Sequence, residues 1–185
     1  MKSLFQVAAN LQHFMIEQRW RFCFIGGIAL QRWGQPRLTV DVDVSLLTGI
    51  GSEQAYVEAL CGRYHPRIPD AADFALANRV LLLQSDEAIP LDIALAGFPF
   101  EEFVIERATD FQFLENVLLR TCSAEDLIIL KAFADRPRDW ADIETILIRQ
   151  SGLLDRDYIA KQLAPLCDLK EEPQIFEKLN QLFDR

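Results

Sequence analysis

The chain has 185 residues, of which half are hydrophobic and a quarter charged, and its formal net charge is −9. This length suits one domain with a sizeable hydrophobic core. The acidic balance argues against a generic nucleic-acid binder, because such proteins gain most of their non-specific affinity by neutralising phosphates. Any contact with nucleic acid must therefore depend on a local group of basic side chains.

The composition also bears on the cellular compartment. Charged and polar residues occur too early in the first 22 residues for a signal peptide, and no uncharged apolar run is long enough to span a bilayer. The four cysteines are scattered without a CxxC pair, and only two histidines accompany them. This pattern argues against a zinc site and predicts reduced thiols in a cytoplasmic protein.

The first elements alternate between helix and strand. Apolar residues at helical spacing over residues 3–18 predict an amphipathic helix with Ser3 as its N-cap. The run RFCFI (21–25) predicts a short strand, and Gly26-Gly27 then lets the chain turn sharply into a short helix over 28–33.

The next stretch, LTVDVDVSLL (38–47), predicts a strand. Its alternation places Val40, Val42 and Val44 on one face and Asp41, Asp43 and Ser45 on the other. A helix is expected over residues 52–62, with apolar side chains facing inward.

A second group of strands follows. The runs ALANRVLLLQS (75–85) and AIPLDIALA (88–96) flank a polar turn and predict a hairpin. Residues 100–107 predict a helix, and residues 111–121 predict one or two strands.

Beyond about residue 122 the strand signal disappears. Ser123, followed by Glu125 and Asp126, resembles a capping box ahead of an apolar helical run. Three further helices are predicted, over 136–149, 155–163 and 173–183. We therefore expect an α+β core over residues 1–121 and a helical C-terminal subdomain over 122–185 that packs on the core.

Asp41 and Asp43 are unusual because strands disfavour aspartate and these two share one strand face. Two carboxylates held this close repel each other unless a cation lies between them. Mg2+ takes oxygen ligands and is commonly held by one or two carboxylates together with substrate phosphates. Asp92, within PLDIAL, is a third strand aspartate. Three such carboxylates suit the two-metal chemistry of nucleotidyl transfer.

Gly26 and Gly27 supply the complementary part. Without side chains they would let a triphosphate approach the backbone, and the following helix would offer its N-terminal N–H groups. A helix-length gap of 13 residues separates this glycine pair from Asp41. A solvated edge strand and an unrelated glycine pair are the competing interpretation, which explains each part but not their combination.

Four stretches carry a family resemblance: IGG (25–27), RLTVDVDV (37–44), LDIALAGFPFE (91–101) and EDLIILKAFADRPRDWADIETIL (125–147). They resemble the DNA polymerase β-type nucleotidyltransferases and, within them, the AbiEii/AbiGii toxin family of minimal nucleotidyltransferases. The resemblance implies a mixed β-sheet with flanking helices, followed by a helical part. It also implies a magnesium-dependent enzyme that moves NMP from NTP to an acceptor and releases pyrophosphate.

The resemblance implies roles for residues beyond the strand aspartates. Lys131 would contact the triphosphate, although a lysine at the rim of a buried helix is the competing interpretation. One of Asp139 and Asp142 would match the second-domain aspartate of the family, and Asp142 aligns slightly better. A charge near a helix N-terminus in an exposed salt bridge is the competing interpretation for each. Arg37 and Thr39 precede the aspartates by even spacing and would orient phosphate or carboxylate, unless Arg37 is a plain strand arginine.

The predicted site thus has three overlapping groups. The predicted metal ligands are Asp41, Asp43 and Asp92. The same three aspartates and Lys131 are the predicted catalytic residues. The predicted NTP-binding residues are Gly26, Gly27, Arg37, Thr39, Lys131 and Asp142.

The sequence does not fix the identity of the acceptor. Members of the resembling family act in toxin–antitoxin systems and some modify tRNA acceptor ends, so tRNA is the leading acceptor and an antitoxin a candidate partner. Arg63, His65 and Arg67 form the best local basic patch for an RNA backbone, which reads equally well as a solvated loop. Transfer to a protein or a small molecule stays open, as does a nucleotide-binding regulatory relative without turnover.

Overall fold

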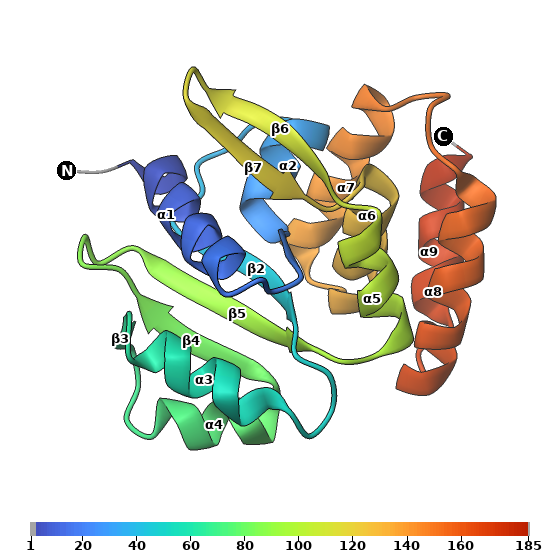
Figure 1. The fold of residues 1–185 in the computed structure, drawn as a ribbon. Helices are drawn as coiled ribbons and strands as arrows, with labels where there is room; N and C mark the ends of the chain where they lie inside the picture. The colour runs from blue at the N-terminus through green and yellow to red at the C-terminus, as the bar shows by residue number, and fades with distance from the viewer. Residues whose placement is uncertain (1–2, 185) are drawn as a thin grey trace. The chain divides into compact units, whose positions relative to one another are not determined.

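The computed structural model describes residues 3–184, and within this range the chain forms nine helices and one seven-stranded sheet (Figure 1). The chain divides into two compact units. The first runs to Ile28 and resumes over Leu38–Cys122, and the second combines Ala29–Arg37 with the chain from Ser123 onward. Residues 29–37 therefore group with the C-terminal helices, although they lie early in the sequence.

The sheet belongs to the first unit and has the strand order β3-β4-β5-β2-β1-β7-β6. The strands are β1 Phe22–Phe24, β2 Val42–Leu47, β3 His65–Pro66, β4 Val80–Gln84, β5 Pro90–Ala96, β6 Thr109–Leu114 and β7 Val117–Thr121. The β2–β5 and β1–β7 pairs are parallel, and the other four pairs are antiparallel. The predicted mixed sheet with flanking helices is confirmed.

The helices of the first unit are α1 Leu4–Glu17, α3 Glu53–Cys61, α4 Ala71–Asn78 and α5 Pro99–Glu106. The helix α2, Gly26–Trp33, begins in the first unit and ends in the second. The remaining helices of the second unit are α6 Ala124–Ala134, α7 Pro137–Arg149, α8 Arg156–Lys170 and α9 Gln174–Phe183. Within this unit α6 packs against α7, α8 and α9.

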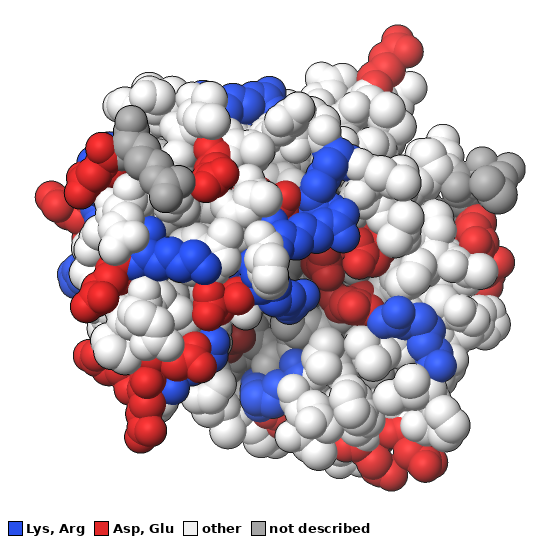
Figure 2. All heavy atoms as spheres, turned by 180° about the vertical axis from the view of Figure 1, so that it is seen from behind, with Lys and Arg blue, Asp and Glu red and all other residues white. Residues whose placement is uncertain are grey.

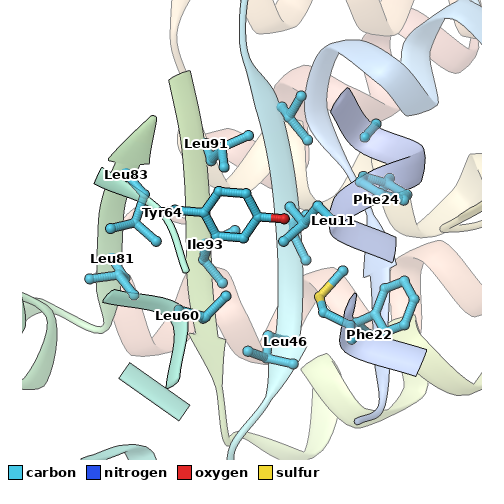
Figure 3. Packing of buried hydrophobic residues seen from close by; sticks show 14 of the residues in the cluster. Leu11, Phe22, Phe24, Leu46, Leu60, Tyr64, Leu81, Leu83, Leu91 and Ile93 are labelled. Atoms are coloured by element: carbon cyan, nitrogen blue, oxygen red, sulfur yellow. The ribbon is translucent and has the colours of Figure 1, made fainter. Parts of the chain in front are cut away.

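One face of the sheet carries the main hydrophobic core of the first unit. Figure 3 shows Leu46 of β2, Leu83 of β4 and Ile93 of β5 in one cluster with Tyr64 and with Leu11 of α1. The leucine and isoleucine side chains are fully buried. Full burial of each such side chain contributes roughly 1.5–3 kcal/mol, so this face fixes how the strands pair.

Predicted helix starts are confirmed at two caps. The Ser3 hydroxyl accepts a hydrogen bond from the backbone N–H of Gln6 at the start of α1, and the Ser123 hydroxyl accepts one from Asp126 at the start of α6. The helix predicted over 155–163 is longer than expected and passes through Pro165 to Lys170. Buried apolar residues continue at a spacing of four into this extension, which explains its length.

Three other predictions were wrong in detail. The strand predicted over 38–47 begins at Val42, and Val40 is 63% exposed rather than on the core face. The reason is that neighbouring strands pair with β2 only from Val42 onward. Residues 75–78, predicted as strand, end α4, which stops at Arg79 in the left-handed conformation. The two-residue strand β3 was not predicted.

No helix in the described part of the chain combines the length and apolar character needed to cross a membrane. Within the described residues no disulfide joins Cys23, Cys61, Cys122 or Cys167.

The Tyr64 hydroxyl gives a test of this packing. It is buried in the apolar cluster of Figure 3 and finds no hydrogen-bond partner within residues 3–184. Burial accordingly raises the pKa of Tyr64. Tyr64→Phe removes a buried polar group that no bond compensates, so we expect the free energy of unfolding in urea to rise by about 1 kcal/mol.

Tyr158→Phe is the matched control. The Tyr158 hydroxyl donates to Oδ1 of the fully buried Asp126 at 2.7 Å, so its removal should lower the free energy of unfolding by about 1 kcal/mol. Equal losses in both variants would contradict the uncompensated state of Tyr64.

Candidate active site

Two of the predicted aspartates lie directly opposite each other on neighbouring parallel strands. Asp43 of β2 pairs in register with Asp92 of β5, and the next pair along the strands is Val44 with Ile93. Because strand residues alternate between faces, the buried Val44 and Ile93 point into the core and the two aspartates point to the opposite face. The register therefore brings both carboxylates together outside the core.

Asp41 lies just before β2, in a bend, and its Oδ1 accepts a hydrogen bond from the Thr39 hydroxyl at 3.0 Å. Its charge reaches Asp92. Burial raises the pKa of Asp92, Arg67 counters this effect, and the negative charge of Asp41 raises it further, so that the net shift is upward. The first unit thus places Asp41 within electrostatic reach of Asp92, with Asp43 opposite Asp92 in register.

The start of α2 lies against Asp43. The backbone N–H of Gly27 donates to Oδ2 of Asp43 at 3.3 Å. Gly26 has a φ of +55°, and a Cβ there would lie 1.9 Å from the same oxygen. A Cβ on Gly27 would lie 2.2 Å from the Thr39 hydroxyl oxygen. A side chain at either position would clash with Asp43 or Thr39, so both positions require glycine. The positive φ of Gly26 is a second reason for glycine there.

Sequence reasoning missed the role of Arg67 at this site. Its guanidinium Nη2 donates to Oδ1 of Asp92 in an ion pair that is partly buried on both sides. The sequence RYHPR indicated the positive charge of Arg67 but not its partner, because Asp92 lies 25 residues further along the chain. The signal that would have found this pair is the strand pairing of β3, which is too short to show periodicity.

The second unit contains its own cluster of charges. Arg37 donates through Nε and Nη2 to the two carboxylate oxygens of Asp142, both at 2.8 Å. Lys131 donates to Asp142 at 2.7 Å and to Asp139 at 2.9 Å. Lys131 and Asp142 are buried, with exposed fractions of 6% and 4%. Both candidate aspartates of α7 therefore contact the predicted lysine.

These contacts shift the proton affinity of Asp142. Burial alone would raise its pKa, but hydrogen bonds and positive charge from Arg37 and Lys131 outweigh burial and lower the pKa. Asp142 is therefore ionised and held by three charge-assisted hydrogen bonds, which are about twice as strong as neutral ones.

The strand aspartates fit magnesium by their chemistry, as hard oxygen donors on a backbone cradle that a Cβ would fill. Among residues 3–184, no group of three or more histidine, cysteine or acidic side chains is arranged as a metal site. Magnesium is commonly held by only one or two carboxylates with substrate phosphates. Asp43 and Asp92, which face each other in register, would supply that smaller number of ligands, with Asp41 just before β2.

The sequence matches the family described as nucleotidyl transferase AbiEii toxin, type IV TA system, over residues 16–182. This span covers most of the 185 residues. The chain belongs to the AbiEii nucleotidyltransferase toxin family. The predicted family and the predicted activity, nucleotidyl transfer, are confirmed, and the family is one of toxins of type IV toxin–antitoxin systems.

Solved structures show related folds. An antigenic nucleotidyltransferase-like protein from Paracoccidioides brasiliensis is 13% identical with a TM-score of 0.50, over 98% of this chain and 92% of that one. The antibiotic-resistance factor ANT(2'')-Ia is 18% identical with a TM-score of 0.49, over 90% and 89% of the two chains. The lincosamide antibiotic adenylyltransferase LnuA is 13% identical with a TM-score of 0.48, over 74% and 92%. A comparison with curated protein sequences gives no match.

The predicted residues of this AbiEii-family protein fall into two groups. The first unit brings together Gly26, Gly27, Thr39 and the aspartates Asp41, Asp43 and Asp92. The second unit brings together Arg37, Lys131, Asp139 and Asp142. Arg37 and Thr39, predicted to orient phosphate or carboxylate, each contact an aspartate.

The predicted RNA patch is partly paired with acidic side chains. Arg67 faces Asp92, and Nε2 of His65 lies 3.0 Å from Asp86. The Arg63 guanidinium lies over the Tyr64 ring, 5.4 Å from its centroid. Figure 2 likewise shows basic and acidic side chains intermixed over the face that it draws. Residues 63–67 therefore attract a polyanion less than their sequence indicates.

Gly26→Ala tests the close approach of α2 to Asp43. We expect the free energy of unfolding to fall by at least about 2 kcal/mol, because the new Cβ combines an unfavourable φ with a clash. Gly152→Ala is the control, since its φ is +76° but no atom lies within 4 Å of the added Cβ. It should cost only about 1 kcal/mol in the same denaturation, and equal costs would argue against the clash.

Asp142→Asn tests the cluster in the second unit. It leaves the Arg37 fork and the buried Lys131 ammonium without their carboxylate, so the free energy of unfolding at pH 7 should fall by about 3 kcal/mol. Because the folded state lowers the pKa of Asp142, its stabilisation is present above the ordinary aspartate pKa and is lost as the pH falls through the lowered value. The difference between wild type and variant should therefore shrink in acid.

Urea denaturation from pH 7 down to pH 2 measures this difference. Asp86→Asn, which removes an exposed partner of His65, is the control and should change the stability little at any pH. A loss in Asp142→Asn that stays constant across this range would rule out the ionised carboxylate as its source.

Proposed function

We propose that this protein is a magnesium-dependent nucleotidyltransferase toxin that transfers NMP from NTP to RNA, with the tRNA 3′ end as the first candidate acceptor. The proposal places it in the cytoplasm, within a toxin–antitoxin or phage-defence system whose antitoxin is a partner. One observation carries the catalytic part. Asp43 and Asp92 face each other on β2 and β5 while the Gly26-Gly27 backbone lies against Asp43.

In this proposal the residues of the first unit divide the work. The N-terminus of α2, with the N–H groups around Gly27, binds the triphosphate. Asp41, Asp43 and Asp92 would hold Mg2+, which when bound neutralises charge on the phosphates and the attacking oxygen. Thr39 fixes the orientation of Asp41.

Asp92 is also the proposed general base. Its carboxylate lies opposite Asp43 on the neighbouring strand, where it could take a proton from an acceptor hydroxyl. It takes the proton of the acceptor hydroxyl, whose oxygen forms a bond to the α-phosphorus. The bond from the α-phosphorus to the bridging oxygen then breaks, and pyrophosphate leaves with the electron pair.

The second unit supplies the proposed phosphate contact. Lys131 carries the positive charge, and Asp142 positions its ammonium while being held itself by the Arg37 fork. A cation at the leaving pyrophosphate stabilises the charge that develops there. Lys131 would exchange one of its two carboxylate partners for a phosphate oxygen.

RNA as acceptor must be reconciled with the net charge of −9. Long-range attraction to RNA is absent on average, so the acceptor would be held by few phosphate contacts and by the fit of its 3′ end. Few contacts imply a shallow dependence of affinity on salt. A general RNA-binding protein would instead show a steep dependence of its affinity on salt.

The decisive experiment incubates the protein and Mg2+ with each labelled NTP in turn and with total tRNA. We expect label on tRNA with a preferred NTP, and no transfer in EDTA. Parallel incubations with cell lysate protein and with an aminoglycoside test the other acceptors. Label on either of these instead of tRNA would overturn the RNA assignment, and nucleotide binding without transfer to any acceptor would indicate a regulatory relative.

Two amide substitutions assign the aspartates. Asp43→Asn should weaken magnesium-dependent NTP binding in calorimetry, because a metal ligand is lost. Asp92→Asn should keep most of the NTP affinity and reduce transfer by about 10²–10⁴-fold, as expected for a general base. Asp86→Asn is the acid-to-amide control and should retain both properties. Full transfer by Asp92→Asn would exclude it as the base.

A further inference from the structure

Arg67 belongs to a single row of residues across the sheet. The backbone N–H of Arg67 donates to the carbonyl of Leu82 at 3.0 Å. Leu82 of β4 pairs with Asp92 of β5, and Asp92 pairs with Asp43 of β2. Residues paired across strands point to the same face. This row leads from Arg67 at the sheet edge to the two aspartates.

The Arg67 side chain reaches along this row to Asp92. It pairs with Oδ1 of Asp92, and only 27% of the Arg67 side chain and 34% of the Asp92 side chain are exposed. At this burial the pair is screened less than a surface ion pair. The guanidinium therefore occupies an oxygen that a metal ion would need.

The pair also answers an electrostatic requirement. Asp43 and Asp92 face each other in register on neighbouring strands, and Asp41 precedes Asp43 by two residues. Three neighbouring carboxylates without a cation repel one another. Arg67 supplies a positive charge from the chain itself, directly at Asp92.

Arg67 is placed where it could release Asp92 at little structural cost. It directly follows β3, a two-residue strand at the edge of the sheet, and both residues of β3 are exposed. The pairing of β2 with β5 does not involve this edge. Movement of the Arg67 side chain would leave the core packing unchanged.

We propose that Arg67 is the resident counter-cation of Asp92 and that a divalent metal displaces it from this carboxylate when it binds. This inference rests on the proposed function, because it requires metal at the strand aspartates. Arg67 is then a positioning residue that acts through Asp92, and not an RNA-backbone contact.

Binding of Mn2+ without nucleotide tests the competition, with the free ion measured by electron paramagnetic resonance. Mn2+ takes the same oxygen ligands as Mg2+. Arg67→Gln should bind Mn2+ about tenfold more tightly than wild type, since it removes a competing charge near the ligand. Arg67→Lys, which keeps the charge, should fall between the two.

Arg63→Gln is the matched control. It removes an equal charge four residues away, from a side chain that lies over the Tyr64 ring and not on Asp92. It should leave the Mn2+ affinity within about twofold of wild type, because exposed charges at a distance are screened. Equal gains in Arg63→Gln and Arg67→Gln would overturn the proposal in favour of general electrostatics, and unchanged or weaker binding in Arg67→Gln would overturn it outright.

A second measurement keeps the test valid should a variant fold poorly. In wild-type protein the side-chain Nε–H signal of Arg67 can be followed by NMR while Mn2+ is replaced by diamagnetic Mg2+. We expect it to shift with the same midpoint as metal binding, and a signal that stays unchanged at saturating Mg2+ would overturn the displacement. Magnesium-dependent NTP binding, measured in the same samples, separates a failure of this inference from a failure of the proposed function. Its absence would overturn the proposed function as well, whereas its presence with an unchanged Arg67 would overturn this inference alone.

Discussion

The parallel pairing of β2 with β5 is the constraint on which the rest of the first unit depends. Hydrophobic side chains at Val42, Val44 and Ile93 bury on one face, and this burial fixes the register of the two strands. A slip by one residue would exchange the two faces of the strand, and would place a carboxylate in the core. The same burial that stabilises the fold therefore sets Asp43 beside Asp92.

The strong repulsion within this arrangement explains the groups around it. Each aspartate has a partner of a different kind: the Thr39 hydroxyl for Asp41, the Gly27 N–H for Asp43 and the Arg67 guanidinium for Asp92. Neutral donors stabilise a carboxylate without binding it strongly, whereas an ion pair competes directly with an incoming metal. The three partners thus each stabilise one carboxylate of the acidic cluster, and only the partner of Asp92 carries a charge.

Local patterns predicted those parts of the structure that depend on local interactions. Helical spacing and capping residues gave α1 and α6, with Ser3 and Ser123 at their starts, and alternation with a polar turn gave the hairpin of β4 and β5. Strand propensity alone extended β2 back to residue 38, because propensity does not reveal where a neighbouring strand ends. The mixed sheet was predictable from the resemblance to the nucleotidyltransferases, whereas the metal-binding role of the aspartates stays a prediction.

Long-range contacts set the limit of such prediction. Arg67 and Asp92 are far apart in sequence, and only the pairing of β3, β4 and β5 brings them into one row. A long-range contact also explains why residues 29–37 group with the C-terminal helices. The Arg37 guanidinium binds Asp142, which lies 105 residues further along the chain. Helical spacing put Asp139 and Asp142 on one face of α7, but their different contacts depend on Arg37.

Those different contacts bear on how the second unit would receive a phosphate. The charges of Lys131 and Arg37 cancel those of Asp139 and Asp142. An anion would therefore bind to this cluster only by taking the place of one carboxylate. Asp142 accepts three short bonds from Arg37 and Lys131, while Asp139 has one bond to Lys131 and a longer 3.6 Å contact with the exposed Arg136. Its Oδ2 is buried without a hydrogen bond from any described residue. Asp139 is therefore the weaker partner, and a phosphate oxygen that reaches Lys131 would displace Asp139 while Asp142 keeps the ammonium in position.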